Sequence, residues 1–193
     1  MSTIGTQSPY AAEAEIRKEL DRDERLLWTG MPRQGLLLRP SDALFIPFSL
    51  IWGGFAFFWE YSVVTQKAPV YFALWGVPFV LVGLYLVVGR FFLDSAQRAR
   101  SFYGVTDQRA LVISGLMSRN VRSLALRNLP EISLNEERNG QGTIVLGAML
   151  PYTSMWYGTS WPGMSSRLAP AFEMIDDARR VYRLIEDARR QAR

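Results

Sequence analysis

Few side chains in this sequence are of the types that carry out chemistry. The 193 residues include no cysteine and no histidine, which excludes a disulfide framework, a thiolate nucleophile, a serine–histidine pair and the usual zinc ligands. Glu136 and Glu137 are adjacent carboxylates, but neighbours on a strand point to opposite faces and do not act as an acid–base pair. No nucleophile–base pair, metal-ligand set or phosphate-binding loop is recognisable. We therefore expect no enzymatic activity, no catalytic or metal-binding residues and no cofactor.

Two groups of side chains are candidates for binding a partner. The turn Thr106–Arg109 holds one cation, Arg109, and the turn either contacts a ligand or only satisfies its own backbone groups. An aromatic stretch, MLPYTSMWYGTSWPG, contains Trp156, Tyr157 and Trp161. Because Trp and Tyr are enriched at interfaces and near lipid headgroups, these rings either form a docking surface or fill the mouth of a barrel. The candidate interaction surface therefore comprises Arg109, Trp156, Tyr157 and Trp161.

Positive charge is concentrated in the C-terminal part of the chain. The net charge is +4, and from Arg90 onward 15 arginines face 10 acidic residues. This excess favours an acidic partner such as anionic lipid headgroups, but it is too modest to indicate nucleic-acid binding. In the last helix the arginines are interleaved with Asp and Glu, which is typical of a solvated helix face with i,i+4 pairs.

Alternating apolar residues predict the β-rich domain that positions these side chains. The run YGVTDQRALVISG (Tyr103–Gly115) indicates a strand, a four-residue turn and a second strand. Further strands are expected at Val121–Leu126, Ile132–Glu136 and Thr143–Leu146, and an Asn-Gly pair before the last of them is a strong hairpin signal. Apolar residues spaced three and four apart predict an amphipathic helix over Ala171–Arg193. We therefore expect an α+β domain in which this helix covers the strands.

The N-terminal segment, residues 1–42, is highly charged except at one place. Ala11–Leu27 is rich in helix formers and predicts a solvated helix. Leu26–Thr29 is a short apolar run ended by Gly30, and it is either a strand of the C-terminal domain or an interfacial segment. We expect this run, which contains Trp28, to be ordered against the C-terminal domain.

Residues 43–89 contain two apolar stretches that are long enough to cross a bilayer. Ala43–Trp59 and Ala68–Gly89 contain 17 and 22 residues without a charged side chain, about 26 and 33 Å as helices against a hydrocarbon core of about 30 Å. Two buried helices of a soluble core are the alternative, but such helices show a polar stripe and these do not. We therefore predict a transmembrane hairpin joined by Glu60–Lys67, whose helices approach closely through glycines.

The positions of arginine and lysine predict the orientation of this hairpin. Arg33 and Arg39 precede it, Arg90 and further arginines follow it, and the connection contains only Lys67. Because loops rich in Arg and Lys stay on the cytoplasmic side, both termini are expected in the cytoplasm.

These features together resemble one protein family. The run Glu24–Pro32 (ERLLWTGMP) before two membrane helices, and the run Tyr103–Gly115 before a leucine-rich strand and the Gly140–Gly142 hairpin, resemble bacterial membrane proteins with a pleckstrin-homology-like (bPH) domain. The likeness covers roughly Glu24 to Gly147. It implies an inner-membrane location and a pleckstrin-homology-like β-barrel capped by a C-terminal helix. Eukaryotic relatives bind phosphoinositides through a basic first hairpin loop, and the loop expected to correspond, Thr106–Arg109, has no cluster of cations, so we expect no phosphoinositide binding.

The resulting hypothesis divides the chain into three parts. Residues 1–42 form a cytoplasmic N-terminal segment, residues 43–89 a two-helix transmembrane hairpin, and residues 90–193 the pleckstrin-homology-like domain. The resemblance implies a non-enzymatic binding or scaffolding module that is embedded in the bilayer and assembles with other membrane or cytoplasmic proteins or with itself. The alternative is a subunit of a small transport or envelope-defence assembly that oligomerises through its hairpin.

Overall fold

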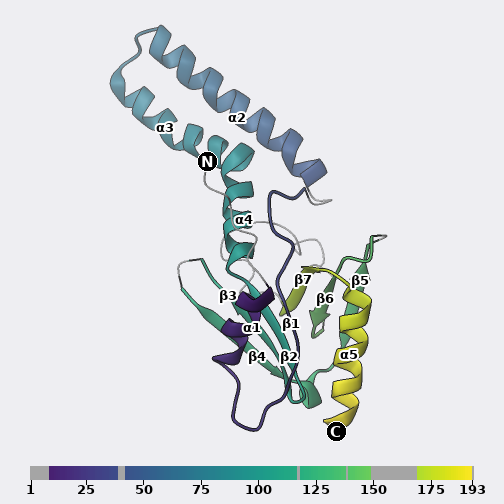
Figure 1. Cartoon of the computed structure of the whole chain (residues 1–193). Coiled ribbons are helices and arrows are strands. Elements are labelled where there is room, and N and C mark those ends of the chain that lie inside the picture. Colours follow the sequence, from purple (N-terminus) through teal and green to yellow (C-terminus); the bar gives the residue numbers. More distant parts are fainter. Residues whose placement is uncertain (1–8, 39–41, 117, 138, 149–168, 193) are drawn as a thin grey trace.

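The computed structural model describes residues 9–38, 42–116, 118–137, 139–148 and 169–192. A long helical hairpin projects from one end of a domain built of antiparallel strands and two further helices (Figure 1). The chain enters this domain, leaves it to make the hairpin, and returns to complete it.

The hairpin consists of α2 (Asp42–Thr65) and a second helical arm built of α3 (Val70–Leu84), a π-helical turn η1 (Tyr85–Gly89) and α4 (Arg90–Ala99). Both Asp42–Thr65 and Val70–Ala99 are long and apolar enough, by length and composition, to cross a membrane.

Glycines bring the two arms of the hairpin together. A Cβ atom added to Gly83 would lie 3.0 Å from the Cα atom of Gly53, so the backbones touch at this level. The predicted connection Glu60–Lys67 is too long, because α2 continues to Thr65 and includes Glu60. An α-helix satisfies its own backbone groups, so it extends past the last apolar residue that the sequence pattern counts.

Arginine side chains make the polar contacts at the base of the hairpin. Arg90 pairs with Asp42 across the two arms at 3.1 Å. Arg98, which is only 4% exposed, pairs with Asp94 and donates a hydrogen bond of 2.7 Å to the backbone carbonyl of Gly35, in the linker before α2. The same guanidinium also donates to the carbonyl of Arg33. The linker is therefore held against α4 where the chain leaves the domain.

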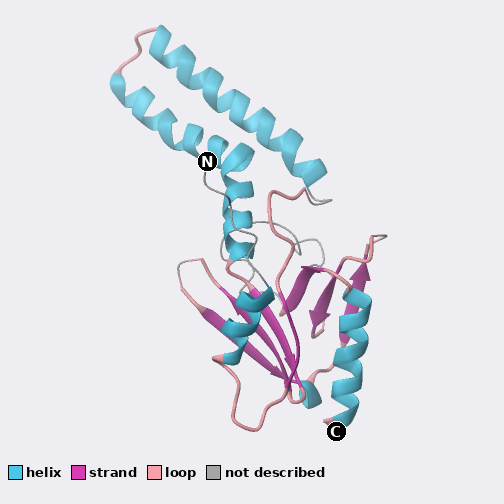
Figure 2. Cartoon of the chain, viewed as in Figure 1, coloured by secondary structure: helices cyan, strands magenta, loops and turns pink. Residues whose placement is uncertain are grey.

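Within the described ranges, seven strands form two antiparallel sheets (Figure 2). The first sheet has the order β1-β2-β3-β4, with strands Leu26–Gly30, Phe102–Thr106, Arg109–Ser114 and Asn120–Ala125. The second has the order β5-β6-β7, with strands Ile132–Glu136, Gly142–Leu146 and Ala171–Ile175. A short 3-10 turn, η2 (Leu126–Asn128), connects the two sheets.

Strand β1 precedes the hairpin in the sequence but joins the sheet whose other strands follow the hairpin. The apolar run around Trp28 predicts this contact. Strand β1 pairs antiparallel with β2, and Gly30 lies opposite Tyr103. The prediction of an ordered contact with the C-terminal domain is therefore confirmed. The strand belongs to the same sheet as β2 although the whole hairpin lies between them in the sequence.

The sheets do not close on each other among the described residues, where each strand pairs only within its own sheet. The described residues therefore form two open sheets, whereas the resemblance implies a closed barrel. The edges nearest each other are joined locally, since the Arg33 amide donates a hydrogen bond of 2.9 Å to the carbonyl of Met174.

The predicted helix over Ala171–Arg193 is wrong in its first part. Residues Ala171–Ile175 are strand β7, and the helix α5 spans Ala178–Gln191. Phe172 and Ile175 are three residues apart, which imitates helical spacing, but they both reach the core because the pairing of β7 with β6 contains an irregularity. A bulge of this kind adds a residue to the alternation and hides the strand period.

The core lies between the two sheets and α5. The Phe172 ring stacks on Tyr103 with a centroid distance of 5.0 Å, and the Trp28 ring lies 5.7 Å from the same Phe172 ring. Val181 and Ile185 of α5 are fully buried in this cluster. Aromatic residues from β1, β2 and β7 therefore bind the N-terminal strand to both sheets.

The first helix is shorter and more buried than predicted. Helix α1 spans Pro9–Arg17, and its Ala12 and Ile16 side chains are fully buried rather than solvated. Ile16 packs over Gly104 of β2, where an added Cβ atom would lie 2.8 Å from the Ile16 Cγ2 atom. The glycine in β2 is thus what lets α1 lie flat on the first sheet.

Candidate binding groove beside the C-terminal helix

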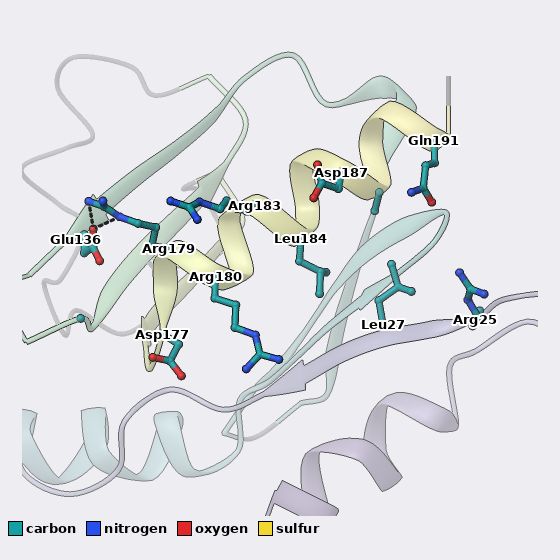
Figure 3. A pocket seen from close by; sticks show the side chains of 12 residues that line it. Arg25, Leu27, Glu136, Asp177, Arg179, Arg180, Arg183, Leu184, Asp187 and Gln191 are labelled. Carbon is teal, nitrogen blue, oxygen red and sulfur yellow. Dashed lines mark hydrogen bonds and ion pairs between the residues drawn. The ribbon is translucent and has the colours of Figure 1, made fainter.

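A groove with a volume of about 680 Å³ lies between α5, the start of β1 and the β5–β6 turn (Figure 3). Three elements that are distant in the sequence build it. Its lining residues are Arg25, Leu27, Glu136, Gly140, Asp177, Arg179, Arg180, Arg183, Leu184, Asp187, Ala188 and Gln191.

The amphipathic pattern of α5 explains which of its side chains reach the groove. Val181, Ile185 and Ala188 are buried against the sheets, so Arg180 and Leu184 fall at the border of the buried stripe. Leu184 and Leu27 of β1 are half-buried at the edge of the core and form the apolar floor of the groove. The groove is therefore a cleft at the margin of the core, with charged side chains around an apolar centre.

The charges of the groove are only partly paired. Arg179 binds Glu136 of β5 with an Nε–Oε2 distance of 2.8 Å. By contrast, Arg25, Arg180 and Arg183 are exposed and make no ion pair with any described residue. The groove thus offers guanidinium groups whose hydrogen-bond donors are open to a ligand.

The aspartates Asp177 and Asp187 also line the groove and form no ion pair among the residues described. Asp177 directly precedes α5, where the helix N-terminus offsets a negative charge. Asp187 follows Arg183 by four residues on α5, a spacing at which opposite charges attract. Arg25 and Arg180 lie toward opposite ends of the groove and, like Arg183, form no ion pair with a described residue.

Arg109, a predicted interaction residue, is held by the N-terminal segment of its own chain. Its Nε and Nη2 atoms donate to the two carboxylate oxygens of Glu24 at 2.7 and 2.8 Å. Its Nη2 atom also lies 3.0 Å from the Asp21 carboxylate and donates to the backbone carbonyl of Glu19. With these donors engaged, the guanidinium serves as a link between β3 and the segment before β1.

The electrostatics of this pair favour its charged form. Burial of the Glu24 carboxyl raises its pKa, but hydrogen bonds from Arg109 and from the Asp21 amide, together with the positive charge, outweigh burial and leave the pKa below its ordinary value. The hydrogen bond to Glu24, together with the nearby carboxylates, raises the pKa of Arg109. The two side chains form a bidentate ion pair of the strong, oriented kind.

The turn that carries Arg109 is stabilised by its own threonine. The Thr106 hydroxyl accepts hydrogen bonds from the backbone amides of Gln108 and Arg109 at 3.1 and 2.9 Å, and it donates to the Arg109 carbonyl at 3.1 Å. Asp107 accepts a hydrogen bond of 3.1 Å from the Arg25 amide. The side chains of this turn therefore hold the local backbone and the entry into β1.

The other predicted interaction residues, Trp156, Tyr157 and Trp161, lie outside the described residues. The groove itself was not predicted. Arg25 and Arg180 come from segments that the sequence pattern assigns to solvated helices, and only the pairing of β1 with β2 brings them to one cleft.

Among the described residues, no group of three or more Asp or Glu side chains is placed to hold a metal ion. The chain matches no family model, no curated protein and no solved structure.

Proposed function

We propose that the protein is a non-enzymatic binding module of the pleckstrin-homology-like type, held at the cytoplasmic face of a bacterial inner membrane by a two-helix transmembrane hairpin. In this proposal the hairpin anchors the domain, and the domain recruits other membrane or cytoplasmic proteins. The parts of the chain outside the hairpin supply the binding surface.

The pairing of β1 with β2 is the observation that carries this proposal. Gly30 and Tyr103 lie opposite each other in one sheet, and the whole hairpin lies between them in the sequence. Because both ends of the hairpin enter the same sheet, they must lie on the same side of any membrane that the helices cross. Two crossings satisfy this condition and a single crossing does not.

The charge distribution supports the cytoplasmic side. Arg33, Arg90 and Arg98 lie at the domain end of the hairpin, whereas the far connection contains only Lys67. An excess of Arg and Lys marks the cytoplasmic end of membrane helices. The domain is then expected in the cytoplasm together with both termini.

The strand arrangement supports the pleckstrin-homology-like type. In the part of the chain that the structure describes, a sheet of four antiparallel strands precedes a sheet of three antiparallel strands, and a C-terminal helix follows both. In this arrangement the hairpin occupies the connection between the first two strands, and the Thr106–Arg109 turn joins the second and third. The Thr106–Arg109 turn is therefore the second strand connection and not the first, as the resemblance led us to expect, and its cation Arg109 is bound by Glu24 and Asp21.

The absence of cysteine allows a direct test of the anchoring. Gln66, in the connection of the hairpin, and Ser118, in the β3–β4 connection, are both exposed and can each be replaced by cysteine. A membrane-impermeant maleimide is expected to label Gln66→Cys in cells with a permeabilised outer membrane, and Ser118→Cys only after the inner membrane is opened. The unchanged chain is the control and stays unlabelled. Labelling of both positions, or of neither, before the inner membrane is opened contradicts the hairpin topology.

The binding role is tested separately by purification of the tagged chain in mild detergent. We expect a partner in stoichiometric amount or a defined homo-oligomer. A chain that purifies as a partner-free monomer under several mild detergents contradicts the scaffolding role.

A further inference from the structure

We infer that the groove between β1 and α5 binds an extended segment of a partner protein that is apolar at its centre and acidic at both ends, and that this segment adds a strand to β1. The inference deepens the proposed binding function and rests on it. None of the described residues that line this groove belongs to the Thr106–Arg109 turn indicated by the sequence.

Strand β1 is the edge of its sheet. Among the residues described it pairs only with β2, so the backbone groups on its other side have no strand partner. The two sheets meet where the Arg33 amide donates to Met174, just beyond the end of β1. The groove opens beside the start of β1, near Arg25. An extended segment in this space meets unpaired backbone donors and acceptors, the condition for strand addition.

The side chains of the groove specify the composition of that segment. Leu27 and Leu184 face each other across its centre, while Arg25 lies at one end and Arg180 toward the other (Figure 3). Apolar side chains of a partner fit the centre, and a carboxylate at each end of the partner segment meets a guanidinium. Arginine is well suited to this because its planar donors bind a carboxylate through two hydrogen bonds.

The position of the groove in the molecule favours a protein over a lipid. Strand β2 follows α4 and runs away from the hairpin, and Leu26 at the start of β1 lies opposite Thr106 at the far end of β2. The C-terminal end of α5 also lies at the end of the domain opposite the hairpin (Figure 1). Arg25 is therefore remote from the bilayer that holds the hairpin, and a soluble or peripheral partner reaches it more readily than a headgroup does.

The experiment uses the full chain in nanodiscs of uncharged phosphatidylcholine. The probes are fluorescein-labelled twelve-residue peptides with Leu and Val at the central positions and Asp and Glu at the flanks, together with peptides in which Lys replaces the acidic residues. Fluorescence anisotropy measures binding to the unchanged chain, to the double variant Arg25→Gln/Arg180→Gln, and to Arg190→Gln. Arg190 is the matched control because it lies on α5, is 74% exposed at its side chain and does not line the groove.

We expect the acidic peptides to bind and the lysine peptides not to bind. Affinity for the acidic peptides is expected to fall about tenfold in the double variant, since two exposed cations are lost, and to stay unchanged in Arg190→Gln. Added salt is expected to weaken binding. Hydrogen exchange of the Leu26–Gly30 amides is expected to slow when the peptide is added, which distinguishes strand addition from loose charge attraction.

Three results overturn the inference. The first is the absence of binding by every acidic peptide, and the second is equal affinity in the double variant and in Arg190→Gln. The third is a different occupant of the groove, shown by binding to anionic phosphatidylglycerol vesicles or by a chain dimer that the double variant abolishes. If the peptides fail while cysteine labelling and co-purification succeed, the groove assignment falls and the proposed function stands.

Discussion

Replacing Glu24 by glutamine is expected to destabilise the domain because it breaks a buried ion pair. The Glu24 side chain is 2% exposed, and its two oxygens accept hydrogen bonds from Arg109 at 2.7 and 2.8 Å. An amide of the same shape keeps one acceptor and turns an N–H group toward the guanidinium. The variant therefore leaves Arg109 partly unpaired in a site that water reaches poorly.

The size of the effect follows from the exposure of the two partners. Removing one member of a fully buried pair costs about 3–5 kcal/mol. Arg109 is 23% exposed and keeps the Asp21 carboxylate at 3.0 Å, so the expected loss lies at or below the lower end, about 2–3 kcal/mol. For a domain of this size that loss lowers the midpoint of thermal unfolding by roughly 10–20 °C.

The measurement is thermal and urea unfolding of the full chain in detergent micelles, followed by circular dichroism. Glu13→Gln is the matched control, because Glu13 pairs with Arg17 on the exposed face of α1 and its loss is expected to change stability by only about 0.3–0.5 kcal/mol. A Glu24→Gln chain that unfolds within 0.5 kcal/mol of the unchanged chain refutes the argument that this pair holds the N-terminal segment to β3.

The pH dependence of stability tests the same Glu24–Arg109 ion pair. The folded-state pKa of Glu24 is depressed, so its contribution to stability is complete above the unfolded-state pKa of about 4.3 and is lost as the pH falls through the folded-state value. The stability difference between the unchanged chain and Glu24→Gln is therefore expected to be constant from pH 8 to about 5.5 and to shrink below about 4.3. If this stability difference grows as the pH falls, the pKa of Glu24 is not depressed in the folded state.

Three further substitutions test other contacts. Gly104→Ala places a Cβ atom against Ile16, so we expect overpacking to reduce the free energy of unfolding by about 1–3 kcal/mol. Hydrogen exchange in α1 is expected to become faster, and unchanged exchange argues against α1 lying on the sheet. Arg98→Gln removes the donors that hold the linker before α2, and limited proteolysis is expected to cut that linker faster, whereas an unchanged cleavage rate counts against the clamp. Gly83→Leu forces α2 and α3 apart and is expected to lower the thermal stability of the hairpin. Gly54→Leu is the control, because there is open space around Gly54. Equal effects of the two substitutions would show that the two arms do not pack as described.

Elements whose signal is local could be predicted from the sequence. The strands around the Thr106–Arg109 turn and the two apolar helices follow from period and length alone. Strand β7 could not be predicted, because the irregularity in its pairing with β6 gives Phe172 and Ile175 a helical spacing. The period of a strand is readable only where its pairing is regular.

The candidate site could be predicted only in part, because it depends on pairs that are remote in the sequence. Arg109 was recognised as the cation of its turn, but its partner Glu24 lies 85 residues away. The groove likewise needs Arg25 and Arg180 on facing elements, and neither has a sequence signal that differs from that of a solvated arginine. All of these contacts depend on the pairing of β1 with β2. The only sequence signal for that pairing is the apolar run around Trp28.

In the proposed membrane topology, the position of the hairpin between β1 and β2 links membrane insertion to the folding of the domain. Strand β1 is synthesised before the hairpin, and its only strand partner among the described residues follows the hairpin. Until β2 emerges, Leu27 and Trp28 have no sheet to pack on, and the Phe172 ring and the α5 side chains of the same core cluster emerge later still. The contact order of this pairing is high, which makes it slow to form. Once both helices are inserted, however, the hairpin returns the chain to the same side of the bilayer and confines β2 near β1. A correctly inserted hairpin thus lowers the entropic cost of closing the sheet, so we expect the groove beside β1 to form faster on a chain whose hairpin is already in the bilayer.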